Sequence, residues 1–229
     1  MNNLQKVGGV SCILFAVALT LGLILITPPF AAMSPEAMQA DNVAARLAYI
    51  ASVSRAQSQL LWIGFALEVI AGGLLFAPLL ALFATFKEQH YGRAALALGL
   101  GTLGIPFFII SHLPRFSLLQ AAQGYAHLDV MQKAARAAAY GYAEGSSAVS
   151  EPIFWAFLAA ALIILAPTMR HARFAARSSW VGVAAGVLGL ISTVGALTIP
   201  ALGFVSVLSL VLLVIWSVGT GLALVRSAG

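Results

Sequence analysis

Six long apolar runs alternate with shorter polar segments along this chain, and the pattern predicts six helices. The runs cover residues 8–27, 60–86, 94–112, 150–166, 180–199 and 204–225. The hydrocarbon core of a bilayer is about 30 Å thick, and a helix needs roughly 20 apolar residues to cross it. The runs are continuous and lack the alternation of a membrane β-strand, which favours helices. We therefore expect an all-α fold in which residues 1–229 form a single integral membrane domain of six transmembrane helices.

Two amphipathic patterns lie in the longer polar segments, after the first and the third run. Ser34-Pro35-Glu36 is typical of a helix start, because serine caps a helix and proline fits its first turn. Apolar side chains then recur at helical spacing in both segments. The first apolar face holds Val43, Leu47 and Ile50, and the second holds Leu128, Met131, Ala135, Ala138 and Tyr142. We interpret both as short interfacial helices in the outer loops, although the second also fits a solvated helix docked on the bundle.

Prolines mark the expected ends and kinks. The first run should end at Pro28-Pro29, the third at Pro114 and the fourth at Pro167, because proline removes a helical hydrogen bond. The second run is longer than a bilayer requires, so it should tilt, kink at Pro78 or protrude. A cleaved signal peptide is a competing interpretation of the first run, whose apolar part exceeds the 7–15 residues typical of signal peptides.

Composition places the chain among membrane proteins. Hydrophobic residues make up 61% of the 229 residues and charged residues only 8%, against roughly 25% charged residues in soluble domains. The net charge of +5 is too dispersed for a phosphate-binding stripe, so nucleic acid is not an expected partner. The expected partner is the lipid bilayer, and a homo-oligomer or a membrane protein partner stays open. Cys12 is the single cysteine, so the chain can form no intramolecular disulfide.

The distribution of Lys and Arg predicts the orientation in the membrane. A cytoplasmic N-terminus puts the short basic segments on the inner side and the two long, mixed-charge loops on the outer side. The inner residues are then Lys6, Lys87, Arg93, Arg170, Arg173, Arg177 and Arg226, with the single acid Glu88. We therefore expect both termini in the cytoplasm. Trp62 and Trp155 should then lie near the outer interface, and Trp180 and Tyr91 near the inner one.

One carboxylate, Glu68, lies inside the second apolar run. A charge in hydrocarbon costs a few kcal/mol, so this side chain should face other helices or water. Gly64 and Gly72 lie one helical turn to either side of it, and small residues let another helix approach closely. The sequence therefore predicts that Glu68 lies at a seam between helices.

The register of the predicted hairpin names the neighbours of Glu68. If the second and third runs pair around residues 87–92, Glu68 is level with Ser111 and His112, and Arg115 lies one turn farther out. Such a layer could be a polar clasp that fixes the register of the hairpin. The alternative is a protonatable or ion-binding site in which His112 tunes Glu68.

Other chemistry finds little support in the sequence. The chain has no nucleophile elbow, phosphate loop or zinc-protease motif, and its four histidines are too scattered for a metal or haem site. We therefore predict no catalytic residues, no cofactor and no metal. Gly182 and Gly186 form a close-packing face on the fifth run, which favours packing within the bundle over a dimer interface.

Three stretches of the chain resemble a bacterial membrane family known as domain of unknown function 4386. They are KVGGVSCILFAVALTLGLI in the first run, FALEVIAGGLLF around Glu68, and WVGVAAGVLGLISTVGALTIP with the final run that ends in LVR. Glu68 resembles an acidic position of the family that we expect to be Asp more often. The resemblance implies a six-helix protein of the bacterial inner (plasma) membrane and implies no activity.

These observations favour a non-enzymatic multi-pass membrane protein that acts in membrane-associated interaction, sensing or assembly. The alternative is a small transporter or channel in which Glu68 is a protonatable or ion-binding group.

Overall fold

The computed structural model describes residues 2–39, 42–171, 176–196 and 203–228, and the regular elements in these ranges are helical. This agrees with the predicted all-α fold. The elements are α1 (Asn2–Ala31), α2 (Pro35–Met38), α3 (Val43–Ser52), α4 (Arg55–Leu74), α5 (Phe76–Ala122), the short 3₁₀ helix η1 (Tyr125–His127), α6 (Val130–His171), α7 (Ala176–Ala196) and α8 (Gly203–Ser227).

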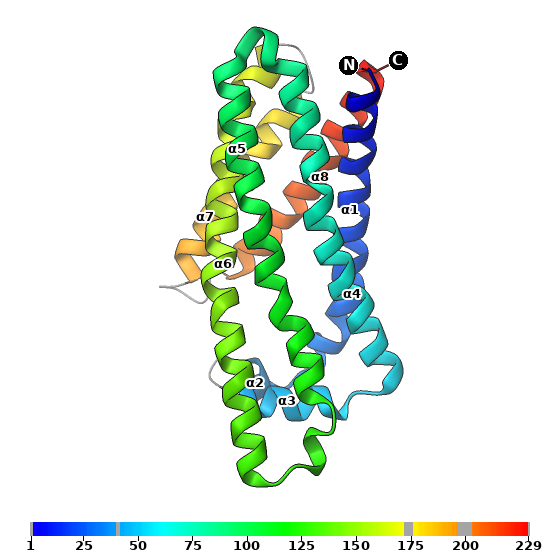
Figure 1. Cartoon of the computed structure of the whole chain (residues 1–229), viewed down its shortest axis with the longest axis vertical. Coiled ribbons are helices and arrows are strands. Elements are labelled where there is room, and N and C mark those ends of the chain that lie inside the picture. Colours follow the sequence, from blue (N-terminus) through cyan, green and yellow to red (C-terminus); the bar gives the residue numbers. More distant parts are fainter. Residues whose placement is uncertain (1, 40–41, 172–175, 197–202, 229) are drawn as a thin grey trace.

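The long helices pack side by side around a shared apolar core (Figure 1). Helix α1 packs against α4, α5 and α8, and the ring continues from α8 through α7 and α6 back to α5. Figure 1 shows both chain ends close together at one end of the bundle, and α2 and α3 across the opposite end. We call these the terminal end and the cap end.

Helix α5 contains the hairpin that the sequence predicts between the second and third runs. His90 has φ −142° and ψ 47°, which is outside the helical region, and the chain doubles back there at the terminal end (Figure 1). A second interruption separates α4 from α5 at Leu75, three residues before Pro78. The ring of a proline clashes with the carbonyl four residues before it, so Pro78 accounts for this break.

Glycines set the closest approaches between helices. A Cβ atom on Gly221 of α8 would lie 2.8 Å from the Gly9 carbonyl oxygen of α1, so the two backbones touch near the terminal end. On α7, a Cβ on Gly186 would lie 2.9 Å from the Cα of Ala159, and one on Gly182 would lie 2.6 Å from the Trp216 ring. Gly182 and Gly186 therefore face α8 and α6 of the same chain, which agrees with the predicted packing within the bundle.

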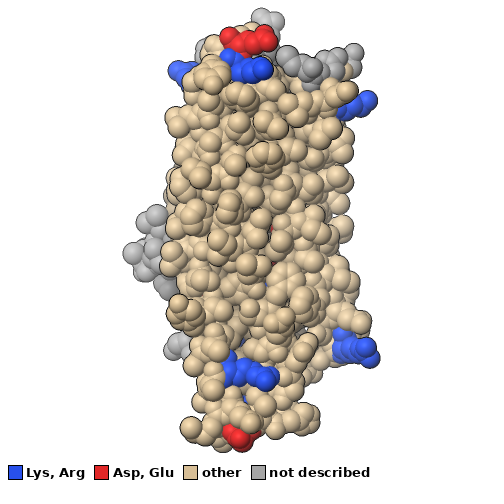
Figure 2. All heavy atoms as spheres, viewed as in Figure 1, with Lys and Arg blue, Asp and Glu red and all other residues tan. Residues whose placement is uncertain are grey.

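Four described helical stretches are long and apolar enough to cross a membrane. They are Asn3–Ala31, Arg55–Ala122, Val130–Arg170 and Val205–Ser227, and the second of them contains the hairpin at His90. Figure 2 shows charged side chains gathered near the two ends of the molecule, with a broad uncharged belt between them on the face in view. A surface of this kind suits a protein whose middle is covered by lipid.

The predicted helix ends at prolines are wrong. Helix α1 continues through Pro28-Pro29 to Ala31, α5 continues through Pro114 to Ala122, and α6 passes Pro167. Proline removes one backbone hydrogen bond, but packing on neighbouring helices holds the rest of the helix together, as is common in membrane bundles.

The second predicted interfacial helix is not a separate element. Its residues form the first turns of α6, which runs unbroken from Val130 to His171. Its polar side faces the protein, because Arg136 Nη1 donates hydrogen bonds to the carbonyl oxygens of Ala121 (3.2 Å) and Gln123 (2.6 Å) at the end of α5. The last carbonyls of a helix have no donor within it, and Arg136 supplies one. The apolar side points outward, with Met131 80% and Tyr142 89% exposed.

The first predicted interfacial segment forms α2 and α3. Ser34 caps α2 as expected, since the Ala37 amide donates to its Oγ at 3.3 Å. Helix α3 buries Leu47 and Ile50 in a second apolar core at the cap end.

Trp155 is buried, because Gly189 on α7 leaves room for its ring, so it is not part of an exposed aromatic belt. Trp180 and Tyr91 are exposed on the surface. The predicted inner residue Arg173 lies outside the described residues.

Candidate functional site

Glu68 lies in α4 with only 2% of its side chain exposed. Glycines bring the neighbouring helices close around it. A Cβ on Gly22 of α1 would lie 3.1 Å from the Glu68 Cγ, Gly64 faces Ile26 of α1, and Gly72 faces Phe108 of α5. The carboxylate is therefore enclosed by α1, α4 and α5, as expected for a charge that cannot face lipid.

Two basic side chains from the second half of α5 reach the same carboxylate oxygen. The Arg115 Nη1 donates a hydrogen bond to Glu68 Oε2, and His112 Nε2 lies 3.7 Å from that oxygen. The guanidinium also stacks over the Phe65 ring, with its Cζ 5.9 Å from the centroid. The hairpin register thus brings Glu68, His112 and Arg115 together, as the sequence predicts.

Ser111 supports the histidine instead of contacting Glu68. Its Oγ donates to the Phe108 carbonyl oxygen at 2.7 Å and lies 3.0 Å from His112 Nδ1. His112 Nδ1 is 2.7 Å from the same carbonyl, which can only accept, so Nδ1 carries the proton. In a neutral ring Nε2 then has a lone pair, and it points at Glu68. The 3.7 Å between Nε2 and the carboxylate oxygen is longer than a hydrogen bond, so the two groups are neighbours without a direct bond.

A second ion pair lies nearby at the cap end. Arg46 of α3 pairs through Nη1 with Glu144 of α6, and its Nε and Nη2 donate to the carbonyl oxygens of Ala37 (3.2 Å) and Gln39 (2.9 Å). The Tyr140 hydroxyl contacts both charged partners. Arg46 thus ties the α2–α3 cap to α6.

The two ion pairs share one cavity of about 380 Å³. This volume falls in the range of roughly 300–1,000 Å³ that is usual for small-molecule sites. Apolar walls surround a few polar groups. The lining residues are Leu23, Ile26, Phe30, Arg46, Phe65, Glu68, Pro114, Arg115, Leu118, Tyr140, Glu144 and Ser147.

In each pair one partner is buried and the other is open. The side-chain exposure is 2% for Glu68 against 37% for Arg115, and 9% for Arg46 against 34% for Glu144. The accessible members of the two pairs, Arg115 and Glu144, therefore have opposite charge. The cavity offers one open cation and one open anion to an incoming molecule.

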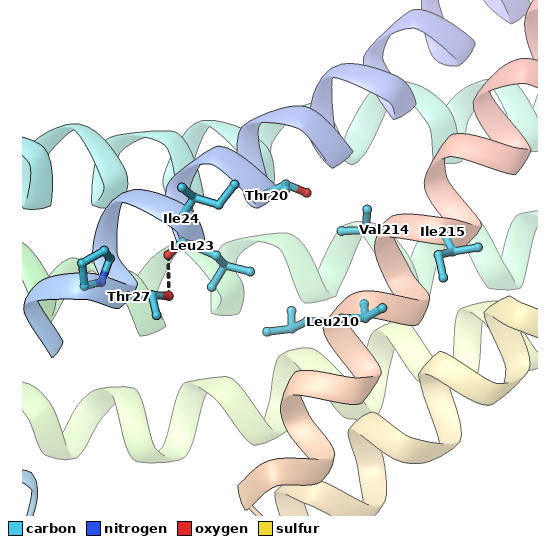
Figure 3. A pocket seen from close by; sticks show the side chains of 9 residues that line it. Thr20, Leu23, Ile24, Thr27, Leu210, Val214 and Ile215 are labelled. Atoms are coloured by element: carbon cyan, nitrogen blue, oxygen red, sulfur yellow. Dashed lines mark hydrogen bonds between the residues drawn. The ribbon is translucent and has the colours of Figure 1, made fainter. Parts of the chain in front are cut away.

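A larger apolar groove of about 570 Å³ lies beside the cavity, between α1 and α8. Figure 3 shows the two helices diverging, with Leu23 on α1 and Leu210 and Val214 on α8 at its walls. Leu23 also lines the polar cavity, so the groove and the cavity adjoin there. The hydroxyl of Thr27 donates to the Leu23 carbonyl oxygen at 2.7 Å, which leaves the groove without a free donor at that position.

Sequence reasoning missed Arg46, Tyr140 and Glu144. A usable signal exists for Arg46, since it stands next to Leu47 and four residues before Ile50, beside the predicted apolar face. Glu144 could not be found in this way, because its partner lies 98 residues away and joins it only through the docking of α3 on α6.

The site brings a carboxylate, a guanidinium and an imidazole together at the edge of one cavity, and the guanidinium is open to it. In the described ranges, no group of three or more His, Cys, Asp or Glu side chains is arranged to hold a metal ion. No family model matches the chain, and no curated protein or solved structure matches it.

Proposed function

We propose that this chain is a non-enzymatic, multi-pass protein of the bacterial inner membrane that binds a ligand in the cavity between Arg115 and Glu144. It would act in membrane-associated sensing or interaction. One observation supports this most: the Glu68–Arg115 pair borders an open cavity with an accessible guanidinium. A purely structural clasp would have no need of a cavity, since side chains would fill the space around it.

The topology that we propose has six spans, with the hairpin at His90 and the α7–α8 pair supplying two spans each. The terminal end faces the cytoplasm, because the described short basic segments lie there. The cap end, with the cavity, faces the outside.

Paired cysteine variants test this orientation. Replacing the single native cysteine, as Cys12→Ser, gives a cysteine-free background. Gln132→Cys at the cap end should react with a membrane-impermeant thiol reagent on intact cells, and Gln89→Cys at the terminal end only after permeabilisation. Both glutamines are exposed, so access to the two sites differs only in the side of the membrane. The opposite labelling pattern would reverse the orientation.

Ligand retention tests the binding function. The protein is extracted from its own membranes in a mild detergent and weighed by native mass spectrometry, which reports any bound molecule. The variant Glu68→Gln/Arg115→Gln removes both charges and leaves no unpaired ion, so it should fold and lose the retained species. Arg93→Gln, an exposed site at the terminal end, is the matched control. A wild-type protein that carries no ligand, or a double variant that carries the same one, would refute the binding function.

A proton-coupled transporter is the second candidate, supported by the His112 Nε2 lone pair that points at Glu68. In proteoliposomes, an imposed potential should then drive proton uptake that a pH-sensitive dye reports. Glu68→Gln should abolish this uptake, and Glu88→Gln, at an exposed site, should not. Equal proton fluxes in empty liposomes would eliminate this candidate.

A further inference from the structure

We propose that the ligand is a membrane phospholipid with a zwitterionic headgroup, one that carries a phosphate and an ammonium group. The phosphate binds Arg115, the ammonium binds Glu144, and an acyl chain lies in the groove between α1 and α8. This inference rests on the proposed function, since it names the ligand of the same cavity.

The charges of the cavity select a headgroup with both signs. Arg115 uses one of its five N–H donors for Glu68, and the described part of the chain gives the others no partner. Guanidinium is well suited to phosphate, because its donors match two phosphate oxygens. Glu144 is the more open member of its pair and can accept from an ammonium group. With two arginines and two glutamates the cavity is formally neutral, so a neutral zwitterion fits it better than an anion.

The groove supplies the place for the chain. Apart from Thr20 and Thr27 its lining is apolar, and its walls on α8 include the exposed side chains of Val211 and Ile215. Such a groove opens toward the hydrocarbon of the bilayer. It adjoins the charged cavity at Leu23, so one amphipathic molecule can occupy both. A soluble zwitterion would leave the groove unused.

The depth of the site agrees with a lipid headgroup. Trp62 packs on Phe116 with 5.0 Å between ring centroids, which places Arg115 near the level of Trp62. Tryptophan prefers the membrane–water interface, where lipid phosphates lie. On α1, Gly22 contacts Gly64 and Glu68, so the α1 wall of the groove begins at the depth of Glu68 and continues toward the cap end. The α8 wall lies farther in, because α8 runs antiparallel to α1 and Gly221 meets Gly9, which puts Leu210 and Ile215 on the inner side of that level. A chain descending from this headgroup would therefore enter the groove.

Native mass spectrometry in defined lipids tests the proposal. The purified full chain is reconstituted with one of three lipids that share the same two acyl chains: a phosphatidylethanolamine, a phosphatidylglycerol and a diacylglycerol. We expect the zwitterionic lipid to survive detergent washing with about tenfold or more excess over the other two, since each charge-assisted hydrogen bond contributes to retention. Equal retention of the phosphatidylethanolamine and the diacylglycerol would overturn the headgroup assignment, and equal retention of the phosphatidylglycerol would overturn the role of Glu144.

Groove variants test the position of the chain. Val211→Trp fills the groove from α8, and Ile24→Trp fills it from α1, at side chains that are 49% and 59% exposed. Leu208→Trp is the control, because Leu208 is 46% exposed on the same helix but does not line the groove. The two groove variants should each lower lipid retention about tenfold, with melting temperatures equal to that of the control. Retention equal to that of Leu208→Trp would overturn the assignment of the groove.

A soluble probe separates this inference from the proposed function. Phosphoethanolamine has the headgroup without the chains, and it should raise the melting temperature of Val211→Trp but not of Glu68→Gln/Arg115→Gln. If lipid retention fails and this shift remains, the cavity binds a ligand that is not a lipid. If both fail, the proposed function fails with the inference.

Discussion

Removing Arg115 should lower the free energy of unfolding much more than removing Glu68. Arg115→Gln leaves a carboxylate that is 2% exposed without its guanidinium, whereas Glu68→Gln leaves a guanidinium that is 37% exposed and can turn to water. Breaking a buried pair by removing one partner costs roughly 3–5 kcal/mol. An ion that can rehydrate loses far less, about 1 kcal/mol.

Protonation of Glu68 limits the loss of stability in Arg115→Gln. A glutamate side chain in water has a pKa of about 4.3, so protonating it costs about 4 kcal/mol at pH 7 and about 1 kcal/mol at pH 5. Protonation becomes the less costly alternative as the pH falls, so the destabilisation should be smaller at pH 5 than at pH 7.

Equilibrium unfolding in mixed micelles measures these free energies. We expect the free energy of unfolding of Arg115→Gln to fall by about 3 kcal/mol at pH 7 and by clearly less at pH 5. For Glu68→Gln we expect it to fall by about 1 kcal/mol at both pH values. The double variant should resemble Glu68→Gln, and the exposed control Arg93→Gln should stay within about 0.5 kcal/mol of wild type. Equal losses for the two single variants, or a loss for Arg115→Gln that does not change with pH, would refute the assignment of the buried carboxylate.

Two further perturbations test the packing of the bundle. Gly221→Ala places a Cβ 2.8 Å from a backbone carbonyl of α1, so it should lower the free energy of unfolding by about 2 kcal/mol. Gly99→Ala is the control, because its Cβ meets nothing within 4 Å, and it should be neutral or slightly stabilising in the same assay. Arg46→Gln should release the α2–α3 cap and speed limited proteolysis between residues 34 and 54. Arg55→Gln, at an exposed site, should leave the cleavage rate unchanged. Equal cleavage rates for the two variants would show that Arg46 does not hold the cap.

The sequence was sufficient to place the buried layer because hairpin geometry depends on few quantities. Once the bend near His90 is known, the helical rise fixes which residues of the two arms are level, and this brings Glu68 to His112 and Arg115. Pro106 and Pro114 lie within α5 without shifting that register, because packing carries the helix past them.

The cap end could not be predicted in the same way. Apolar run length reports where a helix can lie in lipid, and it does not report where the helix stops. Helix α6 therefore extends about 20 residues before its predicted start at residue 150. Two polar side chains of those turns face inward. Arg136 donates to a carbonyl at the end of α5, and Glu144 pairs with Arg46 of α3. Such pairings depend on tertiary docking, which hydropathy does not encode.

An experimental map of the protein in a lipid nanodisc, at a resolution that shows side chains, tests the central claim most directly. We expect non-protein density within hydrogen-bond distance of the Arg115 guanidinium, continuous past Leu23 into the groove between α1 and α8. Side chains closing over the Glu68–Arg115 pair, with neither a cavity nor density beside it, would identify the pair as a structural clasp and refute ligand binding at this site.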